Sequence, residues 1–244
     1  MASPNLPPRF IKLLAHDVRW GLLQALTVSD LRVQELSTWV NEPMNLVSYH
    51  LKKLRLDDLV TTRRSEADGR DQYYSLDIGK LRKLYQAAGY ALHPAMSTSL
   101  PHPINIPHPL RVLFVCTHNS ARSQMAEALL RHKGKQNIEV FSAGNNPTAI
   151  HPDTINTLDR LGIPLTGQQA KSLVQFERQS FDYVITVCDL ARETCPTFPG
   201  GKQLHWGFAD PVNITNAKLR QTAFEHIAKA LSSRIEYFQT EQWA

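Results

Sequence analysis

The chain has 244 residues, of which 42% are hydrophobic and 20% are charged, and its formal net charge is +5. This composition is ordinary for a soluble globular protein. No apolar run reaches the roughly 18 residues that a membrane helix needs, and residues 1–8 contain no apolar export segment, so we expect a cytoplasmic protein. The length suits two domains of about 100 and 140 residues. The mild positive charge permits an anionic partner without requiring one.

Short, closely spaced helical patterns occupy the first part of the chain. Apolar residues recur at helical intervals in four segments, which are residues 10–14, 18–26, 33–40 and 44–55. Two β-rich runs follow at 59–64 and 72–76, and the polar turn 65–71 joins them as a hairpin. Helix, turn, helix and then a basic hairpin is the order of a winged helix-turn-helix domain, which we expect over residues 1–90.

This part of the chain resembles the arsenic-repressor (ArsR) family of winged-helix regulators. Residues 14–23 are similar to the first core motif of that family, residues 47–54 to its recognition helix, and the arginine-rich hairpin to its wing. The resemblance implies a homodimer, formed through terminal helices at 10–26 and 80–90, that binds a DNA operator. Polar side chains on the recognition helix can reach base edges, and basic side chains can reach phosphates. We expect Asn45, Ser48, Tyr49 and His50 near bases, and Lys52, Arg63, Arg64 and Arg70 near phosphates.

Two observations limit this regulatory interpretation. The arsenite-sensing members of the family use cysteines, and this domain contains none, so a thiolate site for arsenite is excluded here. In addition, the same charged side chains could form the solvated face of a helical interaction module. The sequence therefore leaves the operator, the inducer and the direction of regulation open.

A proline-rich segment separates the two parts of the chain. Residues 91–109 contain five prolines but no lysine, arginine, aspartate or glutamate. Proline at this density cannot continue a helix or a central strand, so we expect an extended, semi-rigid linker. The predicted organisation is a DNA-binding domain at 1–90, a linker at 91–109 and a second domain at 110–244.

Strands and helices alternate after the linker. The predicted strands are 111–115, 138–142 and 181–187, and the predicted helices are about 121–132, 152–161 and 218–238. This alternation is typical of an α/β fold with a parallel sheet. In such sheets, ligands bind at the carboxyl ends of the strands.

The loop after the first of these strands carries a candidate nucleophile. Cys116 ends the strand, and Arg122 and Ser123 open the next helix after five intervening residues. Backbone amides at a helix N-terminus bind anions and favour a thiolate over a thiol, and a planar guanidinium suits a tetrahedral oxyanion. The expected oxyanion loop consists of Cys116, Thr117, His118, Asn119, Ser120, Ala121, Arg122 and Ser123. The alternative is a buried cysteine that happens to end a strand.

The second domain resembles the low-molecular-weight phosphatases and the thioredoxin-coupled arsenate reductases. The resemblance covers roughly residues 110–240. It rests on the loop at 116–123, the residues 124–127 after it, Ser-Ala-Gly at 142–144 and Trp-Gly-Phe-Ala-Asp-Pro at 206–211. It implies that Asp210 is the general acid that protonates the leaving oxygen. On its own, Asp210 would be an ordinary turn residue before a proline.

Three cysteines distinguish these two families. Cys188 follows a predicted strand, Cys195 lies seven residues later, and these two and Cys116 are all the cysteines of the chain. A phosphatase needs one thiolate, whereas a reductase must supply two electrons and therefore needs further thiols. The resemblance implies that Cys116 attacks arsenate and that Cys188 then attacks Cys116 and releases arsenite. Cys195 next attacks Cys188, which leaves a disulfide for thioredoxin.

Three alternatives remain open for these cysteines. The chain could be a tyrosine phosphatase with incidental extra cysteines, and phosphatase side activity would fit the same loop. It could also be a regulator whose second domain only senses an oxyanion or a redox state. A zinc site is a weaker interpretation than these two, because two cysteines separated by six residues are not a usual ligand pair.

The same resemblance raises the question of a potassium site. Some of these reductases bind potassium near the loop through positions that match Asn119, Glu127 and Ser142. Their remaining carboxylate position falls near Lys171 in this chain. Because a lysine there supplies the positive charge itself, we expect no required potassium ion. We likewise expect no metal and no bound cofactor, with thioredoxin as an external reductant.

Overall fold

The structure is a computed structural model that describes residues 7–93, 109–134, 138–165 and 167–241. The chain divides into two compact units, and the helices and strands before residue 94 belong to the first, those after residue 108 to the second. Most of the predicted linker, residues 94–108, lies outside the described residues. The domain boundaries at 90 and 110 therefore stay predictions.

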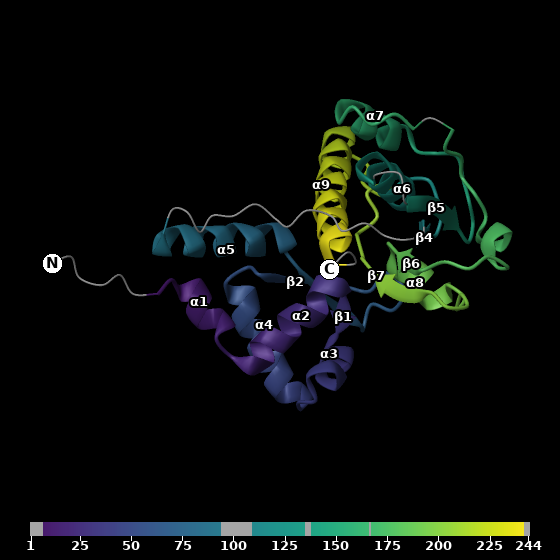
Figure 1. Cartoon of the computed structure of the whole chain (residues 1–244). Coiled ribbons are helices and arrows are strands. Elements are labelled where there is room, and N and C mark those ends of the chain that lie inside the picture. Colours follow the sequence, from purple (N-terminus) through teal and green to yellow (C-terminus); the bar gives the residue numbers. More distant parts are fainter. Residues whose placement is uncertain (1–6, 94–108, 135–137, 166, 242–244) are drawn as a thin grey trace. The chain divides into compact units, whose positions relative to one another are not determined.

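The first unit combines helices with a three-stranded antiparallel sheet. Its described helices are α1 (Arg9–Leu14), α2 (Asp17–Val28), α3 (Val33–Val40), α4 (Met44–Leu56) and α5 (Ile78–Leu92). Its strands are β1 (Leu31–Arg32), β2 (Val60–Arg64) and β3 (Gln72–Leu76), in the order β1-β3-β2. The hairpin β2–β3 is paired from Val60 opposite Leu76 to Arg64 opposite Gln72. Figure 1 labels the helices of this unit together with β1 and β2.

The apolar period of α4 explains how this unit packs. Val47, Leu51 and Leu54 follow one another at intervals of four and three residues, and all three are fully buried. This stripe turns the opposite face of α4, with its polar residues, to solvent. The order of helices and hairpin matches the predicted order, and the assignment to a winged helix-turn-helix stays a prediction.

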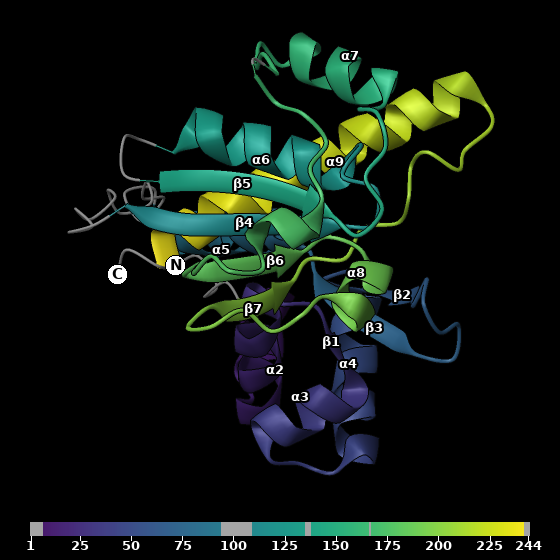
Figure 2. The same ribbon diagram turned by 90° about the vertical axis from the view of Figure 1, so that its right-hand side faces the viewer.

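The second unit is an α/β structure built on a parallel sheet. In chain order its elements are β4 (Leu110–Cys116), α6 (Arg122–Lys133), β5 (Ile138–Gly144), α7 (Pro152–Arg160), the 3-10 helix η2 (Leu173–Phe176), β6 (Tyr183–Thr186), α8 (Asp189–Thr194), β7 (Lys202–His205) and α9 (Ala217–Glu241). All neighbouring strands pair in parallel, in the order β5-β4-β6-β7 (Figure 2). The predicted α/β class with a parallel sheet is therefore confirmed.

The carboxyl ends of these strands meet at one edge of the sheet. Cys116 at the end of β4 lies opposite Gly144 of β5, and Thr186 at the end of β6 lies opposite His205 of β7. Residues 112–116 of β4 are all buried, as expected for a central parallel strand, and α6 packs against β4, β5 and α9. This packing fixes the end of β4 and the start of α6, between which the cysteine loop lies. No helix in the described part of the chain is long and apolar enough to cross a membrane.

Candidate active site

The cysteine loop is held through its carbonyl groups. Amides of residues 146, 148 and 151 donate hydrogen bonds of 2.9–3.0 Å to the carbonyl oxygens of Thr117, His118 and Ser120. In a trans peptide, a carbonyl group and the following N–H point in opposite directions. The amides that follow these carbonyls therefore point away from the segment 146–151. One of them, the amide of Asn119, donates to the sulfur of Cys116 at 3.2 Å.

Cys116 is buried, and its sulfur has two polar contacts. Besides the Asn119 amide, the hydroxyl of Ser123 lies 2.9 Å from the sulfur. Gly144 packs directly behind the loop, where an added Cβ would lie 2.7 Å from the Thr117 carbonyl oxygen and 2.8 Å from the Asn119 nitrogen. Because both of these atoms belong to the backbone, only glycine leaves the loop in this shape.

Arg122 lies at the start of α6 and connects the loop to the segment that carries Asp210. Its guanidinium donates to the carbonyl oxygen of Phe208 at 2.7 Å and to the carboxylate of Asp210 at 2.8 Å. The Arg122 side chain is 4% exposed and that of Asp210 16%. Burial, the largest single effect, lowers the pKa of Arg122, but the charges of Cys188, Asp210 and Cys116 together raise it above its ordinary value. The guanidinium therefore stays charged beside the two thiols.

Cys188 lies beside the loop at the start of α8. Its sulfur is 3.4 Å from the hydroxyl oxygen of Thr117 and accepts a hydrogen bond from the Ala191 amide at 3.4 Å. Burial raises the pKa of Cys188, and the charge of Cys116 raises it further, whereas Arg122 and the Thr117 hydroxyl lower it. The second thiol is thus under the influence of the same charged groups as the first.

Cys195 lies at the opposite end of α8 and is half-buried. Six helical residues separate it from Cys188, which corresponds to roughly 10 Å at the rise of an α-helix. Burial raises the pKa of Cys195 to about 11. The structure therefore brings Cys116 and Cys188 to the loop and leaves Cys195 apart from them.

A buried polar network supports the loop from below. The side-chain amide of Asn119, a residue with a positive φ of 47°, donates to the hydroxyls of Ser123 and Ser142 at 2.8 Å each. The Ser142 hydroxyl donates in turn to the buried carboxylate of Glu127. The Lys171 ammonium lies 3.3 Å from the same carboxylate. These residues do not fit a potassium site, because an ammonium group already neutralises the carboxylate.

The other predicted loop residues contribute mainly through their backbone. Ser120 and Ala121 are buried, and the Ser120 carbonyl oxygen also accepts from the hydroxyl of Thr154 at 3.0 Å. His118 is half-buried, and its ring makes no hydrogen bond to another residue that the structure describes. In the residues described, no group of three histidine, cysteine or acidic side chains is placed to hold a metal ion.

Two of the predicted DNA contacts need correction. His50 is 3% exposed and packs against the ring of His16 at a centroid distance of 4.3 Å, so it does not lie on the open face of α4. Arg63 is half-buried, 3.8 Å from the carboxylate of Asp30 and over the ring of Tyr73. Tertiary packing directs both side chains inward. The remaining candidates are all exposed, namely Asn45, Ser48, Tyr49, Lys52, Arg64 and Arg70.

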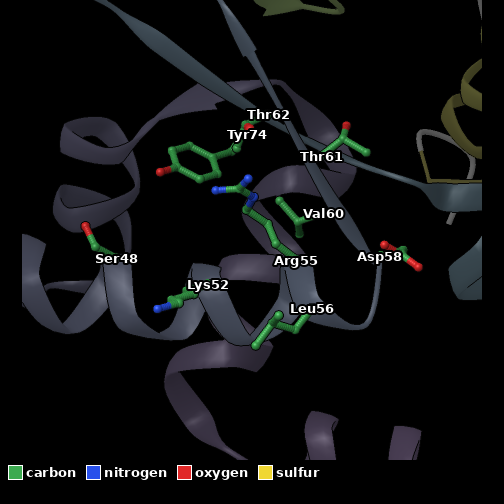
Figure 3. A pocket seen from close by; sticks show the side chains of 9 residues that line it. All are labelled: Ser48, Lys52, Arg55, Leu56, Asp58, Val60, Thr61, Thr62 and Tyr74. Carbon is green, nitrogen blue, oxygen red and sulfur yellow. The ribbon is translucent and has the colours of Figure 1, made fainter.

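A groove of about 660 Å³ lies between α4 and the hairpin of the first unit (Figure 3). Its charged and hydroxyl-bearing lining consists of Ser48, Lys52, Arg55, Asp58, Thr61, Thr62 and Tyr74. The acidic member, Asp58, is paired with Lys80 at 3.1 Å. The other charged members of the lining are the cations Lys52 and Arg55. Arg55 was not among the predicted contacts, because its place beside the hairpin depends on how the elements pack.

Sequence reasoning also missed two sets of buried polar residues in the second unit. The side-chain amide of Gln124 donates to Asn119 at 3.0 Å, and the side chain of Gln168 donates to Gln124. At the ends of β6 and β7, the ring of His205 lies between Thr186 and Asp189. The sequence held one signal for the contact between His205 and Asp189, because Asp189 directly follows the predicted site residue Cys188.

Residues 111–242 match the model of the low molecular weight phosphotyrosine protein phosphatase family. The chain belongs to this family. An arsenate reductase of Shouchella clausii is 33% identical over 129 residues, which are 52% of this chain and 93% of that protein. An arsenate reductase of Halalkalibacterium halodurans is 32% identical over 129 residues with the same coverage. The solved structure of a thioredoxin-dependent arsenate reductase of Corynebacterium glutamicum is 29% identical and covers 62% of this chain and 67% of its own, with a TM-score of 0.42.

Membership of the low molecular weight phosphotyrosine protein phosphatase family confirms the predicted class of the second domain. The family takes its name from phosphatases, whereas the two relatives above are arsenate reductases. Within this family, the arrangement of the thiols therefore decides which activity to propose.

Proposed function

We propose that the chain is an arsenate reductase that uses Cys116, Cys188 and Cys195 in turn and receives electrons from thioredoxin. The observation that carries this proposal is the second thiol beside the oxyanion loop. The sulfur of Cys188 lies 3.4 Å from the hydroxyl of Thr117, which directly follows Cys116. A hydrolytic phosphatase has no use for a thiol in this place, whereas a reductase needs one to attack the first sulfur.

The first step uses the groups that a phosphatase would use. Arsenate binds to the loop amides and to Arg122, and the Cys116 thiolate attacks the arsenic atom. Asp210, 2.8 Å from Arg122, stands beside the oxyanion site and delivers a proton to the oxygen that leaves as water. A bond between sulfur and pentavalent arsenic results.

The second step transfers the electrons. The Cys188 thiolate attacks the sulfur of Cys116, a disulfide forms, and the bond between sulfur and arsenic breaks. Its electron pair stays on arsenic, which leaves as trivalent arsenite. Because burial raises the pKa of Cys188, the opposing effects of Arg122 and Thr117 are needed to make its thiolate available.

The third step requires α8 to open. The Cα atoms of a disulfide lie about 4.4–6.8 Å apart, whereas those of Cys188 and Cys195 are roughly 10 Å apart along the helix. Cys195 can therefore attack Cys188 only after α8 unwinds. Unwinding brings the new disulfide to the surface, where thioredoxin reduces it.

The decisive experiment is a coupled assay with arsenate, thioredoxin, thioredoxin reductase and NADPH. The full chain is expected to oxidise NADPH and to produce arsenite over many turnovers. Cys116→Ser should abolish both arsenite production and hydrolysis of p-nitrophenyl phosphate. Cys188→Ser should abolish arsenite production and retain the hydrolysis, because only the relay needs the second thiol.

The same assay separates the two rival functions. A chain that hydrolyses p-nitrophenyl phosphate but makes no arsenite would be a phosphatase with incidental cysteines. A chain that does neither, yet binds arsenate or phosphate, would be a sensor of oxyanions. Either result would refute the proposed reductase.

For the first unit we propose a second function, binding to duplex DNA as a winged helix-turn-helix regulator. The observation that favours it is the cationic groove beside α4 (Figure 3). Asn45, Ser48 and Tyr49 are exposed on the same helix, where they can reach base edges. Lys52 and Arg55 line the groove between this helix and the hairpin, where phosphates of the backbone can bind them.

Gel-shift assays with the full chain test this second function and its regulation. We propose that the chain binds an operator as a homodimer, which exposed aromatic side chains on α5, Tyr85 and Tyr90, can support. Binding is measured with no addition and with arsenate, arsenite or an oxidant, and sedimentation gives the oligomeric state. Equal affinity in all states would show that the two units are not coupled. No binding to any duplex would refute the DNA-binding function.

A further inference from the structure

The proposed relay leaves one buried polar cluster without a role. Asp189 is the first residue of α8, directly after Cys188, and His205 is the last residue of β7. The two residues are 0% and 2% exposed. The His205 Nε2 lies 3.1 Å from a carboxylate oxygen of Asp189. The Nδ1 of the same ring lies 2.9 Å from the hydroxyl of Thr186. The imidazole thus bridges the end of β6 and the start of α8.

The helix α8 depends on such contacts for its stability. It has six residues, and isolated helices of this length do not form in water. Its buried residues are Asp189 and Ala191, whereas Leu190 is 43% exposed. A hydrogen bond to a carboxylate in a buried site is stronger than one between neutral groups. The contact between Asp189 and His205 is therefore one buried polar attachment of α8 to the sheet.

This attachment opposes the third step of the relay. A disulfide between Cys188 and Cys195 requires α8 to unwind, and Asp189 is the residue next to Cys188. While α8 is closed, Cys195 stays half-buried, and burial raises its pKa to about 11. Opening α8 therefore both shortens the distance and lets the third thiol ionise.

We propose that His205 is a positioning residue that latches α8 to the sheet through Asp189 and so controls when Cys195 reaches the disulfide between Cys116 and Cys188. The inference rests on the proposed arsenate reduction. When the latch opens, the Cys195 thiol gives its proton to solvent and its thiolate attacks the sulfur of Cys188. The new disulfide forms as the old one breaks, and Cys116 leaves as a thiolate, so no external oxidant or reductant is needed.

The latch is tested by the reactivity of Cys195 in the reduced full chain. Alkylation by iodoacetamide is followed at Cys195 by peptide mass spectrometry. Asp189→Ala and His205→Gln should each raise the rate about tenfold, which corresponds to about 1.4 kcal/mol. Asp189→Asn keeps an acceptor for the ring and should raise it less. The matched control is His151→Gln, which removes a comparable side-chain contact at the start of α7.

A double-mutant cycle separates the latch from a general loss of stability. If the two residues act as one contact, the double variant of Asp189→Ala and His205→Gln should react no faster than either single variant. Hydrolysis of p-nitrophenyl phosphate should stay within about twofold of wild type, because that reaction does not use Cys195. In single turnovers with arsenate, the disulfide between Cys116 and Cys188 should be shorter-lived in the variants.

Two results would overturn the latch. One is a Cys195 alkylation rate that stays within about twofold of wild type in all variants. These include the nearly isosteric Thr186→Val, which tests the same cluster if His205→Gln does not fold. The other is strictly additive effects in the double-mutant cycle. If Cys195 reacts as expected but wild type makes no arsenite, the attachment of α8 stands and the proposed reductase falls. The two failures are therefore distinguishable.

Discussion

The hydroxyl of Thr117 contacts the thiol that performs the second step of the proposed relay. It lowers the pKa of Cys188, against the burial that raises it. In Thr117→Val this hydrogen bond is lost, so the pKa of Cys188 rises further and less thiolate is present at pH 7. Arsenite release in single turnovers should slow about threefold to tenfold, since one pKa unit changes the thiolate fraction tenfold. Stopped mixtures analysed for arsenite give this rate.

The pH dependence supplies the control for Thr117→Val. Because the thiolate is the reactive form and its pKa is raised, release should accelerate with rising pH, in wild type and in the variant. The variant should approach the wild-type rate at high pH, where Cys188 is ionised in both proteins. A constant ratio of the two rates at every pH would mean that Thr117 acts by position and not through the pKa of Cys188.

Lys171 neutralises the buried carboxylate of Glu127. Its ammonium lies 3.3 Å from the carboxylate of Glu127, whose side chain is 3% exposed. Lys171→Met leaves this buried carboxylate with less compensation and should reduce the free energy of unfolding by about 1–2 kcal/mol in urea titrations. Lys133→Met is the control, because its partner Glu236 is 45% exposed, and its effect should stay below about 1 kcal/mol. Equal losses in both variants would contradict this role of Lys171.

Local motifs predicted the positions of the loop residues better than the orientations of side chains that depend on distant contacts. Cys116 and Arg122 lie within eight residues of sequence, so one strand end and one helix start place them together. His50 and Arg63 were expected on a DNA-facing surface, but packing buries the first ring and pairs the second side chain with Asp30. Such orientations depend on residues distant in sequence, and no local period contains them.

At the scale of elements, the shape of the loop depends on its contact with β5. Gly144 ends that strand, and an added Cβ would come within 2.8 Å of two backbone atoms of the loop. Gly144→Ala should therefore displace the loop and lower kcat/KM for p-nitrophenyl phosphate and arsenate by at least about tenfold, since small displacements of reacting groups cost this much or more. Gly69→Ala, where a Cβ would meet open space, is the control. Wild-type kinetics in Gly144→Ala would show that the loop tolerates the change.

The same scale shows why some elements escaped prediction. The buried strand β4, the apolar run that contains β6 and the long helix α9 have clear patterns, and their positions were predicted to within a few residues. The six residues of α8 and the four of β7 are too few to establish a period. Moreover, six residues are too few for a helix to be stable on its own, so the existence of α8 depends on the contacts of its buried residues Asp189 and Ala191.

At the scale of the whole molecule, the proposed DNA binding and the proposed arsenate reduction should differ in their response to salt. Binding of a random-sequence duplex by the full chain is expected to weaken with salt, because each phosphate contact releases counterions and contributes about 0.9 to the slope of log affinity against log salt. Lys52→Met and Arg55→Met should each reduce this slope by the contribution of about one phosphate contact and weaken binding to every duplex alike.

Lys83→Met is the control, because Lys83 is an exposed cation on α5 that does not line the groove. This variant should leave the slope unchanged. Fluorescence anisotropy from about 50 to 200 mM salt measures it, with arsenate reduction followed in the same samples. If both groove variants keep the wild-type slope, the phosphates do not enter the groove, and the DNA contacts of the first unit lie elsewhere.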